Sequence, residues 1–284
     1  MMDVLVPILT MGLLGLFFSL CLVFAYKKLR VEEDPRVVAI ADILPQANCG
    51  ACGYSGCRAF AEAVVKGDAP TNGCPVGGEQ VAAQVASILG EEAQALVKKV
   101  ARLHCRGTKT AAKDRGEYIG VTTCRAAHLV GGQKQCSYGC LGFGDCIQAC
   151  LFDAMEMGDD GLPRIDENKC TACGRCVEAC PRNIIELHPV DQEIIVFCRS
   201  LDRGPLARKV CKNACIACGI CVRACPEGII LENNLAKIVD YKKILPEQIP
   251  AIEKCPTKAI GRIHRSSEEE QAQAKTNEKQ AFAP

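Results

Sequence analysis

The second half of this chain contains a repeated phrase in which cysteines recur at fixed short spacings. The phrase occurs as CIQACLFDAMEM (146–157), CVEACPRNIIEL (176–187), CVRACPEGIILE (221–232) and, in degenerate form, IEKCPTKAIGRI (252–263). Steps of 30, 45 and 30 residues separate the last cysteines of these phrases, which are Cys150, Cys180, Cys225 and Cys255. The phrases therefore form two pairs. The run Cys-x2-Cys-x2-Cys-x3-Cys-Pro is typical of paired iron–sulfur clusters, in which the fourth cysteine binds the other cluster. This spacing predicts one-electron transfer.

In the first pair, residues 136–190, one motif is regular and the other is stretched. The stretched motif is Cys136-x3-Cys140-x5-Cys146-x3-Cys150, and the regular one is Cys170-x2-Cys173-x2-Cys176-x3-Cys180-Pro. Crossed ligation predicts two clusters. Their expected ligands are Cys136, Cys140, Cys146 and Cys180 for one, and Cys150, Cys170, Cys173 and Cys176 for the other. The segment GLPRID (161–166) is predicted to be the hairpin that joins the two halves.

The second pair, within residues 191–263, has lost part of its repeat. The 30-residue step places Leu245, Gln248 and Ala251 where three cysteines are expected ahead of the last one. We predict that one cluster remains, on Cys215, Cys218, Cys221 and Cys255. Cys225, although it precedes a proline as a ligand would, is left without partners.

A separate cysteine group comes earlier, in the glycine-rich segment NCGACGYSGC (48–57) and the following GCPVGG. Glycines let the backbone approach a cluster and donate N–H bonds to its sulfurs. We predict a further cluster on Cys49, Cys52, Cys57 and Cys74. A structural zinc site is the alternative, because zinc also binds four cysteines. The spacing and the surrounding glycines favour iron–sulfur.

Four more cysteines flank the first pair of motifs on both sides. Because the chain ends of one compact module lie close together, we predict that they hold an additional cluster. They are Cys105, Cys124, Cys198 and Cys211. Separate unligated thiols are the alternative, since buried cysteine also behaves as a small hydrophobe. The expected cofactors are thus four [4Fe–4S] clusters, or five if these cysteines converge.

An apolar segment near the N-terminus predicts a membrane anchor. Residues 4–26 contain no charge, and 23 helical residues span about 34 Å, enough to cross a bilayer. Lys27, Lys28 and Arg30 follow directly, so the positive-inside rule predicts an external N-terminus and a cytoplasmic remainder. A cleaved signal peptide is the alternative, but a basic n-region and an A-x-A site are missing. We expect a single-pass protein of the cytoplasmic membrane.

These observations together predict an α+β protein with six parts. The segment 79–103, apolar at helical spacing, is expected to be helical. The parts are an anchor (1–30), an α-rich cluster module (31–104), a connector (105–135), a two-cluster ferredoxin-like module (136–190), a degenerate second one (191–263) and a disordered tail (264–284).

The composition excludes several classes of function. A net charge of +1 and 5% aromatic residues argue against nucleic acid as a partner. Neither a dinucleotide fingerprint nor a Walker sequence is present, so no nucleotide site or complete active site is predicted on this chain. The four histidines show no metal-ligand spacing and receive no role. Two basic stretches, 98–115 and 199–212, are either solvated faces or a surface that docks an acidic redox protein or anionic lipid.

The order of these parts resembles the B subunit of Rnf-type complexes, in the long form with an extra ferredoxin pair. The resemblance covers about residues 1–263, and residues 48–74 are similar to the four-iron Fes domain of that family. It implies an electron-transfer subunit that takes electrons from reduced ferredoxin and passes them to membrane partners. The whole complex then couples this flow to NAD reduction and to Na⁺ or H⁺ transport.

Two other functions are consistent with the residues alone. The chain could be an iron–sulfur subunit of another membrane-associated reductase, because single ferredoxin repeats occur in many redox enzymes. It could also be a zinc-binding scaffold that transfers no electrons, since zinc accepts the same four-cysteine ligand sets.

Overall fold

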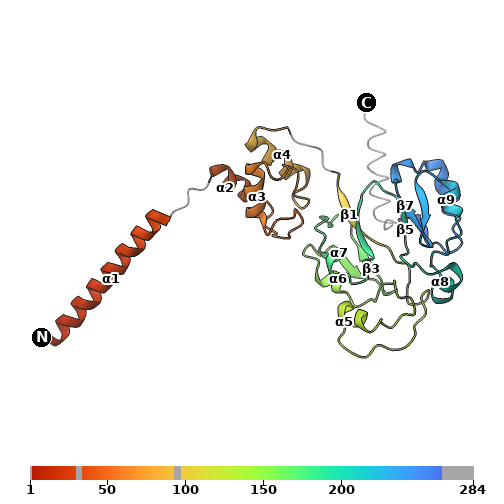
Figure 1. Cartoon of the computed structure of the whole chain (residues 1–284), viewed down its shortest axis with the longest axis horizontal. Coiled ribbons are helices and arrows are strands. Elements are labelled where there is room, and N and C mark those ends of the chain that lie inside the picture. Colours follow the sequence, from red (N-terminus) through yellow and green to blue (C-terminus); the bar gives the residue numbers. More distant parts are fainter. Residues whose placement is uncertain (1, 30–33, 93–96, 264–284) are drawn as a thin grey trace.

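The computed structural model describes residues 2–29, 34–92 and 97–263 (Figure 1). It begins with a long helix, α1 (Met2–Leu29), which projects away from the rest of the chain. The segment Ile8–Leu29 is long and apolar enough to cross a membrane, and none of it is buried against other parts of the protein. The predicted apolar N-terminal helix is therefore confirmed.

The next part is a small helical module with its own core. It consists of α2 (Pro35–Ile43), α3 (Cys57–Lys66) and α4 (Gly78–Leu89). The Asp34 side chain caps α2 by accepting a hydrogen bond from the N–H of Arg36. The three helices pack through the fully buried side chains of Ile40, Phe60 and Val85. This packing holds α3, which carries Cys57, against the glycine-rich loop that precedes it.

The expectation of a helix through residues 79–103 is wrong for residues 99–103. Helix α4 ends at Leu89 because Gly90 adopts the left-handed conformation (φ 72°). Residues Lys99–Leu103 form a strand, β1, which pairs antiparallel with β4 (Ile185–Pro189). Pairing with β4 outweighs the local helical pattern, and β1 belongs to the first ferredoxin-like module rather than to the helical one.

The first ferredoxin-like module is built from two similar halves. One half has α6 (Asp145–Gln148) and β2 (Met155–Met157), and the other has β3 (Pro163–Ile165), α7 (Arg175–Ala179) and β4. Strands β2 and β3 pair antiparallel, which confirms the predicted hairpin. Each short helix follows a left-handed glycine and carries one motif cysteine, Cys146 or Cys176. The two helices contact each other and bring the halves together.

The second module repeats this plan. Its strands are β5 (Ile194–Val196), β6 (Ile229–Glu232), β7 (Leu235–Ile238) and β8 (Ile260–Arg262), paired β5–β8 and β6–β7. Its helices are α8 (Gly204–Val210), α9 (Ile220–Ala224), α10 (Ile249–Ile252) and two 3₁₀ turns, η1 (Tyr241–Lys243) and η2 (Pro246–Gln248). Ile249 and Ile252 of α10 belong to the buried core of this module, together with Cys225.

The connector between the helical module and the first motif contacts both ferredoxin-like modules. It contains α5 (Cys124–Leu129). The N–H of Lys109 donates to the carbonyl of Asp160 in the first module (3.0 Å), and Ala112 forms an isolated bridge with Cys211 next to the second. A further bridge joins Asp114 to Lys134 within the connector. Through these contacts the segment holds distant cysteines in fixed positions. The predicted tail at 264–284 lies outside the described residues.

Candidate iron–sulfur sites

Five cavities within the described residues are each lined by four cysteines. All 22 cysteines lie in this part of the chain as free thiols. The five sets are site 1 (Cys49, Cys52, Cys57, Cys74), site 2 (Cys150, Cys170, Cys173, Cys176), site 3 (Cys124, Cys140, Cys146, Cys180), site 4 (Cys105, Cys136, Cys198, Cys211) and site 5 (Cys215, Cys218, Cys221, Cys255).

Sites 1, 2 and 5 bring together the same four cysteines that the sequence grouped. In each of them the loop between closely spaced cysteines wraps one side of the cavity. The last member comes from a more distant segment: Cys74 in site 1, Cys150 in site 2 and Cys255 in site 5. The crossing of the fourth cysteine between motifs is thus present in the geometry of both ferredoxin-like modules.

Sites 3 and 4 differ from the sequence-based grouping by one exchange. Cys124 lies with Cys140, Cys146 and Cys180, where Cys136 was expected. Cys136 lies with the flanking cysteines of site 4. In the predicted additional set, Cys105, Cys124, Cys198 and Cys211, Cys136 takes the place of Cys124. In the predicted first-module set, Cys136, Cys140, Cys146 and Cys180, Cys124 takes the place of Cys136.

The position of Cys124 follows from the way α5 begins. The Asp145 carboxylate, at the start of α6, accepts hydrogen bonds from the N–H groups of Cys124 (2.8 Å) and Arg125 (3.1 Å). The Thr123 hydroxyl caps the same helix end by accepting from Ala126. Helix α5 is therefore anchored at the N-terminus of the helix that carries Cys146, and Cys124 reaches site 3.

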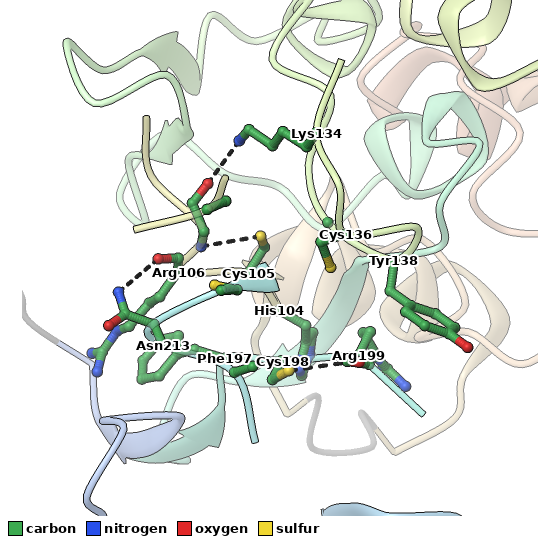
Figure 2. Close-up of a pocket in the computed structure, with 16 residues that line it drawn as sticks. His104, Cys105, Arg106, Lys134, Cys136, Tyr138, Phe197, Cys198, Arg199 and Asn213 are labelled. Carbon is green, nitrogen blue, oxygen red and sulfur yellow. Dashed lines mark hydrogen bonds between the residues drawn. The ribbon is translucent and has the colours of Figure 1, made fainter. Parts of the chain in front are cut away.

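The position of Cys136 follows from contacts that tie its loop to the connector. The ammonium group of Lys134, which is buried, donates to the carbonyl of Gly107 at 2.7 Å. The Asp114–Lys134 bridge adds a backbone connection. Figure 2 shows the side chains of Cys105, Cys136 and Cys198 around the resulting cavity of site 4.

The sulfur atoms accept hydrogen bonds from backbone N–H groups. In site 4 the N–H of Gly107 donates to Cys105 (3.3 Å) and that of Ser200 to Cys198 (3.4 Å). Similar bonds of 3.4 Å reach Cys74 from Gly77, Cys150 from Ala154 and Cys170 from Ala101. Such donors stabilise negative charge on sulfur, as cluster thiolates require.

Burial makes the free thiols poor acids. It raises the pKa of Cys140, Cys146, Cys176 and Cys198 to about 12. A coordinated cation removes the thiol proton, which compensates for this cost. The N–H···S bonds to these four-cysteine sets fit the thiolates of an iron–sulfur cluster.

Two electrostatic interactions between thiols and two hydrogen bonds link the five sites in a series. In addition to burial, the thiol of Cys49 raises the pKa of Cys173, which links sites 1 and 2, and that of Cys146 raises the pKa of Cys176, which links sites 2 and 3. The N–H of Cys140 donates to Cys105 at 3.4 Å, which links sites 3 and 4. The N–H of Cys215 donates to Cys198 at 3.3 Å, which links sites 4 and 5.

The two remaining cysteines line none of these cavities. Cys21 is exposed on α1. Cys225 is 1% exposed and packs among apolar side chains that include Ile229 and Ile252, and its thiol donates to the carbonyl of Lys243 (3.6 Å). Apolar residues therefore occupy the place where the degenerate motif would have supplied partners for Cys225.

The two basic stretches lie side by side, because the N–H of Lys212 donates to Ala111 and the N–H of Lys113 donates to Val210 (both 2.9 Å). Several of their cations are engaged within the protein: Arg102 pairs with Glu167, Arg199 with Glu186, and Arg115 donates to two carbonyls. The exposed cations on the segments around these backbone contacts are Lys109, Lys113, Arg203, Arg208, Lys209 and Lys212, which we call the basic patch.

A series of cysteine-lined cavities on ferredoxin-like modules defines a multi-centre iron–sulfur electron carrier. Comparison with family models agrees with this class. Residues 44–76 match the model described as "Putative Fe-S cluster", and residues 163–186 and 212–231 match the "4Fe-4S binding domain".

Comparison with curated proteins identifies the family. The chain is 50% identical to the B subunit of the Na⁺-translocating ferredoxin:NAD⁺ oxidoreductase complex of Acetobacterium woodii, over 90% of this chain and 77% of that protein. It is 41% identical to the B subunit of the proton-translocating complex of Clostridium ljungdahlii, over 93% and 94% respectively. The B subunit of the ion-translocating oxidoreductase complex of Methanosarcina acetivorans is 38% identical, over 70% of this chain and 76% of that protein. The chain belongs to this family of B subunits, as its resemblance to Rnf-type proteins indicated.

Proposed function

We propose that this chain is the electron-transfer subunit of an ion-translocating ferredoxin:NAD⁺ oxidoreductase complex. It accepts electrons from reduced ferredoxin and relays them toward the membrane-bound subunits, while the whole complex couples this flow to Na⁺ or H⁺ transport. The observation that carries the proposal is the serial order of five four-cysteine sites, in which cysteines of successive sites interact electrostatically or through a hydrogen bond.

Each site holds one [4Fe–4S] cluster through its four cysteines. When bound, these clusters supply reversible one-electron chemistry. The protein stabilises the thiolates through backbone N–H groups and buries them between apolar strands and short helices. Because each potential depends on hydrogen bonding and burial, differences between sites 1 and 5 set the direction of flow along the series.

The basic patch receives the electron donor. Ferredoxin is expected to be acidic. The patch includes Lys212, which follows Cys211 of site 4, and Lys113, which follows the Ala112 that bridges Cys211. Complementary charge increases the rate of encounter more than it increases affinity. Docking here would place the donor within reach of sites 4 and 5, at the opposite end of the series from the helical module.

Helix α1 anchors the chain in the cytoplasmic membrane. The basic residues Lys27 and Lys28 in its last turn favour the cytoplasmic side, so the iron–sulfur modules lie in the cytoplasm. A reporter that is active only in the cytoplasm, fused after Pro284, is expected to be active. Activity restricted to a reporter that works outside the membrane would contradict this topology.

Metal analysis of the anaerobically purified full-length chain tests the function directly. Five four-iron clusters predict about 20 iron atoms per chain. Fewer than about ten, or zinc in place of iron, would overturn the cluster assignment and favour the zinc-scaffold alternative. If reduced ferredoxin then reduces these clusters, and this reduction slows at high ionic strength, the result would support ferredoxin as the electron donor.

A further inference from the structure

A polar cluster lies on the β1–β4 ribbon, and one of its members, His104, also lines the cavity of site 4 (Figure 2). Successive side chains of a strand point to opposite faces, so Glu186 and His188 of β4 share a face, and Leu187 between them lines site 2. His104 directly follows β1, and its N–H donates to the carbonyl of Ile184 at 2.7 Å. The ribbon thereby brings together three potential metal ligands that are far apart in the sequence.

Hydrogen bonds determine which ring nitrogens carry protons. His104 Nδ1 lies 2.7 Å from the carbonyl oxygen of Val196, and because a carbonyl only accepts, this nitrogen carries a hydrogen. His188 Nδ1 lies 3.0 Å from Oε1 of Gln192. The amide nitrogen of Gln192 donates to the carbonyl of Ile194, which fixes its oxygen toward the ring, so His188 Nδ1 also carries a hydrogen.

The two Nε2 atoms consequently face each other without hydrogens if both rings are neutral. They are 2.8 Å apart, and two lone pairs repel at this separation unless a cation lies near both. Oε2 of Glu186 is 3.4 Å from Nε2 of His104 and 3.5 Å from Nε2 of His188. Two imidazole nitrogens and one carboxylate oxygen thus converge on one point.

We propose that His104, Glu186 and His188 bind one divalent transition-metal ion, represented by Zn²⁺. A zinc ion lies about 2.0–2.1 Å from each ligand atom, which in tetrahedral geometry places pairs of ligand atoms about 3.3–3.4 Å apart. The two separations from Oε2 of Glu186, 3.4 and 3.5 Å, are close to that value. The two Nε2 atoms, 2.8 Å apart, are closer together and would separate slightly around the ion. Its ligand set contains no cysteine and is therefore distinct from those of the iron–sulfur sites, although His104 borders the cavity of site 4.

The surroundings match those of a metal site. Ligating histidines usually donate their other N–H to a carbonyl or a side-chain oxygen, as both rings do here. The Arg199 guanidinium pairs with Oε1 of Glu186, which orients the carboxylate and leaves Oε2 for the ion. His104 is buried, whereas the Glu186 side chain is 44% exposed, so an ion can enter from the carboxylate side. The bound ion would fasten β4 to the end of β1.

Zn²⁺ binding to the full-length, iron-loaded chain under anaerobic conditions tests the proposal. Equilibrium dialysis followed by metal analysis should show one Zn²⁺ per chain in addition to the iron. Glu186→Gln and His188→Gln should weaken this binding at least tenfold while the iron content stays unchanged. His128→Gln removes an exposed histidine of α5 and serves as the matched control, with affinity equal to the unmodified chain.

Equal Zn²⁺ binding by Glu186→Gln, His188→Gln and His128→Gln would overturn the proposal, as would the absence of bound Zn²⁺ in the unmodified chain. Equal binding would place the ion outside this cluster, and absence of binding would mean that the cluster holds no metal ion. The Glu186 side chain is partly exposed, so Glu186→Gln is expected to fold normally. This variant therefore tests the proposal even if His188→Gln disturbs the ribbon. Iron content, measured on the same samples, reports separately on the iron–sulfur sites.

Discussion

The backbone N–H of Cys140 donates a hydrogen bond to Sγ of Cys105 over 3.4 Å. Cys140 belongs to site 3 and Cys105 to site 4, so this bond joins two cavities whose other cysteines come from different parts of the chain. A similar bond from Cys215 to Cys198 joins sites 4 and 5. Site 4 is therefore the link between the two ferredoxin-like modules, and its cysteines come largely from the segments that connect them.

Serine substitutions at Cys124 and Cys136 will separate the two possible groupings. Because Cys136 lies in site 4, we expect Cys136→Ser to perturb the same cluster as Cys198→Ser. Because Cys124 lies in site 3, Cys124→Ser should perturb the same cluster as Cys146→Ser. Each variant should lose between about one and four iron atoms. Iron analysis and electron paramagnetic resonance of the reduced proteins will identify the cluster affected.

The contrary outcome is equally specific. Cys136→Ser would then alter the same electron paramagnetic resonance signal as Cys146→Ser, and Cys124→Ser the same signal as Cys198→Ser. This result would mean that the stretched motif binds its cluster as its spacing alone predicts. The exchange between sites 3 and 4 would then be wrong.

Replacement of Cys225 should leave the iron content unchanged. The thiol is fully buried among apolar side chains and lines none of the five cysteine cavities. A serine hydroxyl there replaces a weakly polar thiol, so we expect a loss of about 1–3 kcal/mol in stability. Cys255→Ser, in site 5, should instead remove or convert one cluster. Equal loss of iron from both variants would show that Cys225 is a ligand.

Charge reversal in the basic patch should slow electron uptake from ferredoxin. Lys109→Glu with Lys113→Glu is expected to lower the association rate about tenfold at low ionic strength. The effect should vanish as salt rises, because exposed charges are screened beyond about 8–10 Å. Stopped-flow reduction of the clusters measures this rate. The matched control is the double variant Lys66→Glu with Lys254→Glu, which reverses two exposed lysines outside the patch. If both double variants lower the association rate equally, ferredoxin does not dock at the patch.

Arg106 should fasten β8 to the connector. Its guanidinium lies 3.4 Å from the ring centroid of Phe197 and donates to the carbonyls of Lys258 (3.1 Å) and Arg262 (3.2 Å). Lysine cannot reproduce this planar fork, so Arg106→Lys should weaken the contact by about 1–2 kcal/mol. Hydrogen exchange at residues 258–263 should accelerate roughly tenfold or more. The exposed Arg208→Lys is the control, and unchanged exchange in Arg106→Lys would contradict the role.

The spacing of the cysteines was sufficient to group the members of sites 1, 2 and 5. Ligands within one short loop are placed by local geometry, and the crossing of the fourth cysteine follows from the repeat itself. The hairpin between β2 and β3 and the apolar N-terminal helix were predictable for the same reason, since each depends on residues that are neighbours in the sequence.

Only the tertiary structure decided three features of this protein. They are the exchange of Cys124 and Cys136, the strand at Lys99–Leu103 and the contact between His104 and His188. Cys124 reaches site 3 because the Asp145 carboxylate fixes the start of α5, and Cys136 reaches site 4 because Lys134 binds the carbonyl of Gly107. The strand forms because β4, far away in the sequence, offers it a partner in register, with Leu103 opposite Ile185 at one end and Lys99 opposite Pro189 at the other. Such contacts depend on how separate segments pack, and no local pattern in the sequence encodes them.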